Sequence, residues 1–131
     1  MSSAVRRTHT VLVADDDEQI RILVWEILAE EGWRVLPARH GQEALQLLAR
    51  FGDSVDVVLA DVVMPRLGGK DLAQRIARDY PHIRVVFFSG YGDSPELGSE
   101  FPDAEVLDKP FTAEQLLAAV SAASRKRRRN E

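Results

Sequence analysis

A mostly apolar run of strand length, residues 55–60, ends at a single carboxylate, Asp61. Pro65 and the pair Gly68-Gly69 follow within a few residues. A Val/Leu run bounded in this way is typical of a strand that is buried on both faces of a sheet. We therefore expect Asp61 at the carboxyl end of a buried strand, the edge at which open α/β sheets hold their ligands. This position makes Asp61 the first candidate for a reactive group.

Strand and helix patterns alternate along the whole chain. Strands are predicted at 9–14, 33–36, 55–60, 83–88 and 104–107, with helices between them and after the last. Apolar residues at i, i+3, i+4, i+7 and i+8 predict the first helix, with Leu23 and Val24 both facing inward. Pro37 is expected to stop the second strand, and the Gly and Pro residues of 91–103 predict a short or irregular fourth helix.

Alternation of this kind predicts a flavodoxin-like, doubly wound α/β fold. We expect a five-stranded parallel sheet of order 2-1-3-4-5, joined by right-handed crossovers, with helices on both faces. The composition of the 131 residues, with 45% hydrophobic and 29% charged, is that of a soluble globular protein. We expect a single domain over residues 1–131, with its core at about 9–124 and a basic tail at 125–131.

The net charge of −4 includes this basic tail, so the rest of the chain is more acidic than the total suggests. An acidic body suits a cation ligand and disfavours direct binding to nucleic acid. The tail is interpreted as a solvated run that complements a helix dipole, with a nucleic-acid or partner contact as the alternative. The chain has no cysteine, which excludes disulfides and Cys-ligated zinc.

No apolar run approaches the length of a membrane span, and the first residues lack the apolar core of a signal peptide. We therefore expect a cytoplasmic protein without membrane contact. We expect no output domain after the last predicted helix, because only the basic tail lies beyond it. The chain is accordingly expected to act alone through protein contacts, or to have been cut from a longer protein.

Polar side chains follow four of the five predicted strands. Asp15 and Asp16 follow the first, Asp61 the third, Ser89 the fourth and Lys109 the fifth. In the order 2-1-3-4-5 these strand ends lie side by side on one rim of the sheet. Carboxylates gathered there repel one another unless a cation joins them, and oxygen ligands with open water positions favour Mg²⁺. A metal, an ammonium group and a hydroxyl around one carboxylate are the parts that stabilise a phosphoryl group transferred onto it.

Each of these motifs has a plainer interpretation when taken alone. Residues 15–18 are typical of a helix N-terminus rich in capping acids, Asp61 of a turn, and Lys109-Pro110 of a loop. Only their joint occurrence, in this order and at the ends of these strands, favours a site.

The combined pattern resembles the response-regulator receiver domain of two-component signalling. The matching segments are Val11–Asp17, Leu59–Pro65 with Gly68-Gly69, Val86–Gly90 and Lys109–Phe111, and the likeness covers roughly residues 9–124. The resemblance implies that Asp61 accepts a phosphoryl group from a phosphohistidine of a histidine kinase. The resulting change of conformation would control binding of a downstream protein. Such a domain catalyses only its own phosphorylation and dephosphorylation and is not otherwise an enzyme.

The resemblance also implies a role for each residue of the site. Asp15, Asp16 and Asp61 would hold Mg²⁺ together with the main-chain carbonyl of Val63. Ser89 and Lys109 would contact the phosphoryl oxygens, and the Lys109-Pro110 bond would be cis.

The chain departs from the family pattern at Val106, three positions before Lys109, where the family usually has an aromatic switch residue. This departure and the broken fourth helix resemble receivers that work with hybrid histidine kinases. Val63 and Tyr91 would flank the phosphoryl group and position water poorly, which predicts a long-lived phospho-Asp61. Two alternatives stay open. One is an interaction module that works without phosphorylation, and the other is a metal-dependent phosphatase, which would need an acid where Val63 stands.

Overall fold

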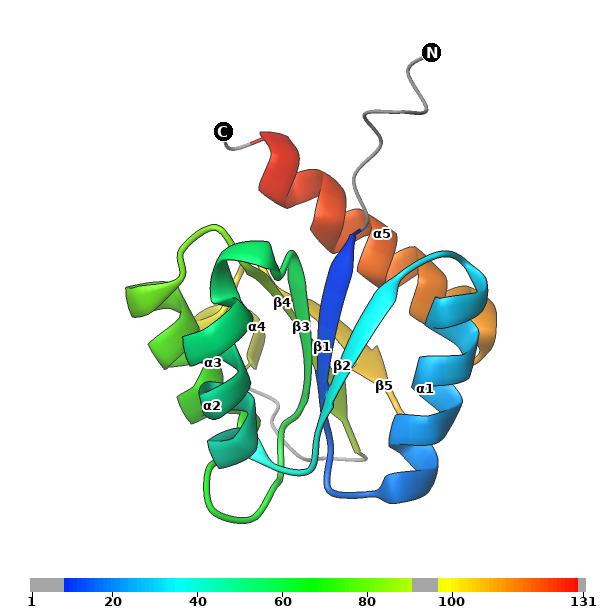
Figure 1. Ribbon diagram of the computed structural model, residues 1–131, viewed down its shortest axis with the longest axis horizontal. Helices are drawn as coiled ribbons and strands as arrows, with labels where there is room; N and C mark the ends of the chain where they lie inside the picture. The colour runs from blue at the N-terminus through cyan, green and yellow to red at the C-terminus, as the bar shows by residue number, and fades with distance from the viewer. Residues whose placement is uncertain (1–8, 91–96, 130–131) are drawn as a thin grey trace.

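The computed structural model describes residues 9–90 and 97–129. They form a parallel sheet of five strands in the order β2-β1-β3-β4-β5 (Figure 1). The elements in chain order are β1 (Thr10–Ala14), α1 (Glu18–Glu30), β2 (Arg34–Ala38), α2 (Gly41–Phe51), the 3₁₀ turn η2 (Gly52–Ser54), β3 (Val57–Asp61), α3 (Gly69–Asp79), β4 (Arg84–Ser89), α4 (Leu97–Glu100), β5 (Glu105–Asp108) and α5 (Ala113–Arg129). The predicted doubly wound fold and its strand order are confirmed.

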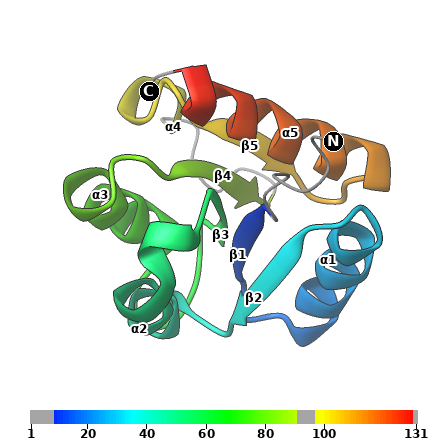
Figure 2. The same ribbon diagram turned by 45° about the horizontal axis from the view of Figure 1, so that its top comes forward.

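Helices cover both faces of the sheet (Figures 1 and 2). Helices α1 and α5 lie on one face and α2 and α3 on the other. Every residue of the central strands β1 and β3 is buried, because apolar side chains on both faces of these strands meet helices. On the α1/α5 face Val13, Leu59 and Phe88 belong to one core cluster. On the opposite face the core includes Leu12 and Val58.

The helix ends follow from local sequence. The Asp17 side chain accepts hydrogen bonds from the N–H groups of Gln19 and Ile20 and so caps α1. At the start of α5 the Thr112 hydroxyl accepts from the Gln115 N–H, and the Gln115 side chain accepts from the Thr112 N–H. This reciprocal pair is a capping box, and it fixes where α5 begins after the loop that carries Lys109.

Three features differ from the sequence predictions. Pro37 lies within β2 instead of ending it, because β2 is an edge strand with one side unpaired. Leu23 is 44% exposed, whereas Val24 and Leu28 of the same helix are buried. Helix α5 continues through Arg129, so the described part of the predicted basic tail is helical. The described part of the fourth helical region is a single turn of helix, Leu97–Glu100, as predicted.

Candidate functional site

Asp61 is the last residue of β3 and is 7% exposed. The chain leaves the sheet immediately after it. The Val62 N–H donates to the Phe88 carbonyl of β4, and the Gly69 N–H donates back to the Val62 carbonyl. A Cβ atom on Gly69 would lie only 2.4 Å from the Asp61 carbonyl oxygen. Helix α3 therefore begins against the Asp61 backbone, an approach that only glycine allows.

The Lys109 ammonium group lies between two carboxylates from different strands. Its Nζ atom is 3.0 Å from Oδ2 of Asp61 and 3.1 Å from Oδ2 of Asp15. Asp15 follows β1 and is completely buried, and the Lys109 side chain is 25% exposed. The neighbouring strands β1 and β3, and β5 on the far side of β4, thus bring the polar side chains at their carboxyl ends together on one rim of the sheet.

Backbone N–H groups hold the other carboxylate oxygens. Oδ1 of Asp15 accepts from the Asp17 N–H at 2.9 Å, and Oδ1 of Asp61 accepts from the Val63 N–H at 3.1 Å. The Arg21 guanidinium donates to the main-chain carbonyl of Asp15 at 2.7 Å. Arg21 was missed by the sequence analysis, because position i+6 on a following helix carries no motif. It orients the backbone beside the acidic group.

The charges of the site act on each other. Burial raises the pKa of the Asp15 carboxyl, and the hydrogen bond from the Asp17 N–H lowers it. The nearby Asp61 carboxylate raises this pKa further and Lys109 lowers it, and the net result is a pKa above the usual value. Burial lowers the pKa of Lys109, but the hydrogen bonds and charges of Asp61 and Asp15 outweigh it, so the pKa of Lys109 is raised. Lys109 is therefore a fixed positive charge at neutral pH.

The acidic residues fit a hard divalent cation. One carboxylate oxygen from each of Asp15, Asp16 and Asp61 lies within 4.8 Å of the others. Asp16 is exposed, so the group opens to solvent on one side. One ammonium group does not neutralise three carboxylates, and each bonded oxygen keeps a second lone pair. A site of few carboxylates with room for water matches the preference of Mg²⁺.

Ser89 ends β4 and is 7% exposed. Its hydroxyl donates to the Gly90 carbonyl at 3.1 Å. The Ser89 carbonyl accepts from the Lys109 N–H, which ties the ends of β4 and β5 together. The Lys109-Pro110 bond is cis, as predicted. Ser89 thus lies on the same rim as Lys109, with its hydroxyl bonded to the adjacent main chain.

The remaining predicted positions lie around this rim. Val63 is 62% exposed, and its backbone N–H donates to Oδ1 of Asp61, as described above. The proposed role of the Val63 carbonyl stays a prediction. Val106 is on β5 and is exposed. Tyr91 lies outside the described residues.

Comparison with known proteins places this geometry in a family. The model of the response regulator receiver domain matches residues 11–121. The chain belongs to this family. Receiver domains are signalling modules of two-component systems, and they bind Mg²⁺ at a cluster of aspartates such as the one formed here by Asp15, Asp16 and Asp61.

Curated relatives of this receiver domain are longer proteins. The sensor kinase CckA of Brucella abortus is 34% identical over 113 residues, which are 85% of this chain and 12% of CckA. The transcriptional regulatory protein CpxR of Klebsiella pneumoniae is 34% identical over 120 residues, which are 90% of this chain and 50% of CpxR. The chain thus spans half or less of the length of these relatives.

Solved structures show the same fold. A response regulator receiver domain protein from Clostridium thermocellum superposes with a TM-score of 0.86 at 31% identity, covering 94% of this chain and 99% of that one. A response regulator receiver protein from Sinorhizobium medicae gives 0.83 at 28% identity, covering 92% and 98%. Within the described residues of this receiver domain, no helix has the length and apolar character needed to span a bilayer.

Proposed function

We propose that Asp61 is the phosphoacceptor of this receiver domain and takes its phosphoryl group from a histidine kinase in a Mg²⁺-dependent reaction. The observation that carries the proposal is the contact of Lys109 with both Asp61 and Asp15 on the rim where Asp16 and Ser89 also lie. Among the described carboxylates Asp15 shares burial at a strand end, contact with Lys109 and neighbouring acids, but it is completely buried, whereas Asp61 keeps 7% exposure.

The chemistry is a transfer between two nucleophiles. A carboxylate oxygen of Asp61 attacks the phosphorus of the phosphohistidine and forms a P–O bond. The P–N bond breaks, and the imidazole leaves with the electron pair and takes up a proton. Bound Mg²⁺ supplies positive charge that neutralises the phosphoryl oxygens.

The protein's own groups orient the reacting atoms. Because the Val63 N–H holds one Asp61 oxygen and Lys109 the other, the carboxylate has a fixed direction before the donor arrives. Lys109 keeps its charge throughout and contacts the new phosphoryl group, and Ser89 turns its hydroxyl from Gly90 towards that group. This rotation of the hydroxyl breaks its hydrogen bond to the Gly90 carbonyl, and a hydrogen bond to the phosphoryl oxygen takes its place.

The output is a shift in conformation. A phosphoryl group on Asp61 favours the state in which Ser89 and Lys109 both contact it, and this state presents a different surface to a downstream protein. We assign this exchange of partners to the cytoplasm and expect no direct contact with nucleic acid. Phosphotransfer from a panel of purified histidine kinases would identify the phosphodonor.

Phosphorylation is tested with a small-molecule donor. Incubation with acetyl phosphate and Mg²⁺ is expected to add about 80 Da to the intact protein, the mass of one phosphoryl group in place of a proton. Labelling is expected to disappear in Asp61→Asn and when EDTA replaces Mg²⁺. Asp53→Asn is the matched control, because Asp53 is an exposed acid away from the rim and its loss leaves labelling unchanged.

Two results would reject the proposal. Absence of labelling in the wild-type protein at saturating donor would favour an interaction module that works without phosphorylation. Rapid multiple turnover of the donor, without accumulation of the labelled protein, would favour a phosphatase.

A further inference from the structure

Asp15, the completely buried acid of the rim, has a hydrogen-bond partner for each of its four polar groups. Its N–H donates to the Ala38 carbonyl of β2 at 3.1 Å. Its two carboxylate oxygens accept from the Asp17 N–H and from Lys109. Its carbonyl accepts from Nη1 of Arg21 at 2.7 Å, a short bond from a charged donor. Arg21 thus joins α1 to the strand end that carries the acidic group.

The helix directs the Arg21 side chain towards the rim. Arg21 is the fourth residue of α1, and its N–H donates to the Asp17 carbonyl at 3.1 Å. Side chains of an α-helix tilt towards its amino end. A long side chain from the first turn therefore extends back past the helix cap and reaches Asp15, six residues earlier in the chain.

The Asp15 carbonyl belongs to the peptide that links Asp15 to Asp16. Hydrogen bonds hold the chain on both sides of this peptide, at the Asp15 N–H and at the Asp17 N–H. The peptide is a rigid plane, and between two held ends it can still turn as a unit through ψ of Asp15 and φ of Asp16. The bond from Arg21 opposes that rotation. Because the rotation changes φ of Asp16, it would also change the direction of the Asp16 side chain.

The Asp16 carboxylate depends on its main chain for its position. Lys109 and backbone N–H groups hold the oxygens of Asp15 and Asp61. Asp16 is exposed, and within the described residues its side chain has no hydrogen bond or ion pair. One of its oxygens nevertheless lies within 4.8 Å of an oxygen of each of the other two acids. A turn of the peptide before Asp16 would move this oxygen away and remove one carboxylate from the group.

We propose that Arg21 is a positioning residue for Mg²⁺. By holding the Asp15 carbonyl it keeps the Asp16 carboxylate in the group that binds the cation, and it acts without touching the cation or the phosphoryl group. The inference rests on the proposed function, which assigns Mg²⁺ to this group. Loss of an outer residue that orients a metal ligand typically weakens metal affinity by about 10- to 100-fold. We expect the low end, about tenfold, because the other hydrogen bonds of residues 15–17 remain.

The charge of Arg21 by itself would have the opposite effect. A guanidinium cation beside three carboxylates repels Mg²⁺, so removal of the charge alone would strengthen Mg²⁺ binding. Removal of the hydrogen bond weakens Mg²⁺ binding, because Asp16 loses its place. The sign of the change in affinity therefore separates the two roles.

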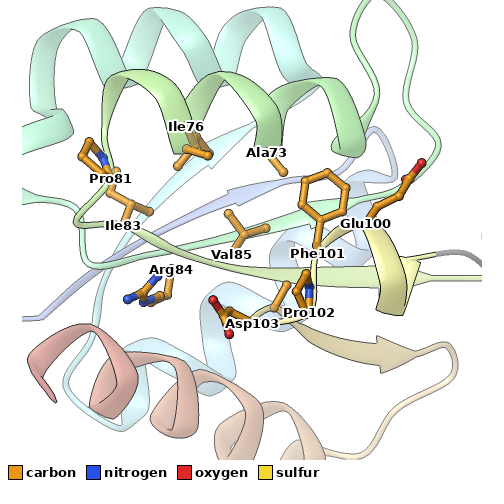
Figure 3. A pocket seen from close by; sticks show the side chains of 12 residues that line it. Ala73, Ile76, Pro81, Ile83, Arg84, Val85, Glu100, Phe101, Pro102 and Asp103 are labelled. Carbon is orange, nitrogen blue, oxygen red and sulfur yellow. The ribbon is translucent and has the colours of Figure 1, made fainter. Parts of the chain in front are cut away.

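The opposite edge of the sheet, where the strands begin, provides a matched control. Figure 3 shows this edge at β4, where Ile83 and Val85 lie below Ile76 of α3 beside a hollow of about 360 Å³. The residues assigned to Mg²⁺ and to the phosphoryl group all lie at the other edge. Arg34 begins β2 and is exposed. Arg34→Met therefore removes the same charge from the chain without a change at the rim.

The Mg²⁺ affinity of the full chain is measured from the ¹H–¹⁵N NMR shifts of the amides of 15–17 and 61–63 during titration with MgCl₂. Arg21→Met keeps an unbranched apolar stem without a donor, and it is expected to raise the dissociation constant about tenfold. Arg21→Lys keeps the charge and a donor on a flexible stem, and it is expected to raise the constant by less. Arg34→Met is expected to leave it unchanged.

Two further readouts distinguish positioning from a general loss of structure, and urea unfolding in EDTA checks that each variant is folded. For labelling by acetyl phosphate, Arg21→Met is expected to need about tenfold more Mg²⁺ to reach half of its maximal rate, with a maximal rate close to that of the wild type. A purely structural defect would lower the rate at every Mg²⁺ concentration. In an Asp16→Asn background, Arg21→Met is expected to change the Mg²⁺ affinity less than about twofold, because the residue through which Arg21 acts is already lost.

The inference is overturned if Arg21→Met binds Mg²⁺ as tightly as the wild type or more tightly. It is also overturned if the effects of Arg21→Met and Asp16→Asn on affinity add in full, or if the wild type binds no Mg²⁺. Failure of the phosphoacceptor proposal gives a different result, since the wild type would then bind Mg²⁺ but gain no mass from acetyl phosphate.

Discussion

The close approach of α3 to Asp61 makes Gly69→Ala the most informative substitution in the fold. The new Cβ atom would lie 2.4 Å from the Asp61 carbonyl oxygen and 3.1 Å from the Val62 Cα atom. These neighbours are backbone atoms of a buried strand end, so no side chain can turn away. An ordinary contact requires α3 to move by about 1 Å, and overpacking of this kind costs about 1–3 kcal/mol.

Helix propensity acts in the opposite direction. Alanine in a helix is favoured over glycine by up to about 1 kcal/mol, so propensity alone predicts that Gly69→Ala stabilises the protein. The destabilisation caused by the close contact is larger than the stabilisation gained from helix propensity. We expect a net loss of about 1–2 kcal/mol in the free energy of unfolding, which lowers the melting temperature by roughly 4–8 °C in a chain of this length.

Urea unfolding followed by circular dichroism, in EDTA and again in Mg²⁺, measures this loss. Gly98→Ala is the matched control, because a Cβ atom there meets nothing within 4 Å and Gly98 also lies in a helix. We expect Gly98→Ala to be neutral or slightly stabilising, and Gly69→Ala also to slow labelling by acetyl phosphate. Equal or greater stability of Gly69→Ala would refute the reasoning, since it would mean that α3 starts farther from Asp61.

Three further predictions concern the charges of the site and the lifetime of phospho-Asp61. Lys109→Met is expected to lower the free energy of unfolding by about 1–2 kcal/mol in EDTA, less than the loss of a fully buried ion pair, because the Lys109 side chain is 25% exposed. Mg²⁺ supplies positive charge to the same carboxylates and should reduce the difference in stability between the variant and the wild type. An equal loss in both buffers would contradict this. Asp15→Asn is expected to be more stable than wild type in EDTA. The pKa of Asp15 is raised in the folded state, so folding of the wild type becomes less favourable as this carboxyl ionises. The variant's urea midpoint should therefore exceed that of the wild type by a margin that grows as the pH rises from about 4 to about 7, and a constant margin would count against the burial of Asp15. Val63→Asn is expected to shorten the lifetime of phospho-Asp61, followed by loss of the mass label, because a short polar side chain positions water better than valine.

Prediction from the sequence succeeded where local pattern and chain order carry the information. The strand runs and helix periods defined the elements, and the order of a doubly wound sheet placed the ends of β1, β3, β4 and β5 on one rim. Lys109 was expected beside Asp61 on this ground, and the two side chains are 3.0 Å apart. The family likeness supplied the cis bond at Lys109, because nothing in the local pattern distinguishes a cis from a trans proline.

Prediction failed where the outcome depends on which neighbours an element meets. Pro37 breaks most strands, but β2 has a free edge and loses no sheet hydrogen bond. Leu23 fits the helical apolar period, yet α1 buries a narrower stripe than the period suggests, because its main neighbours among the described elements are β2, β1 and α5, and they do not reach Leu23's side of the helix. No pattern marked Arg21, whose hydrogen bond to Asp15 joins a helix to a strand end.

The sequence by itself determined the class of fold, the order of the strands and the set of polar residues at their carboxyl ends, because these depend on periodicity and connectivity along the chain. Only the tertiary structure decided that α3 needs glycine at position 69 and that Arg21 of α1 donates to the main-chain carbonyl of Asp15. Both features arise from distances between atoms of different elements, which no pattern along the chain records. They depend on how closely helices and loops pack on the sheet, and side-chain packing in three dimensions sets that distance.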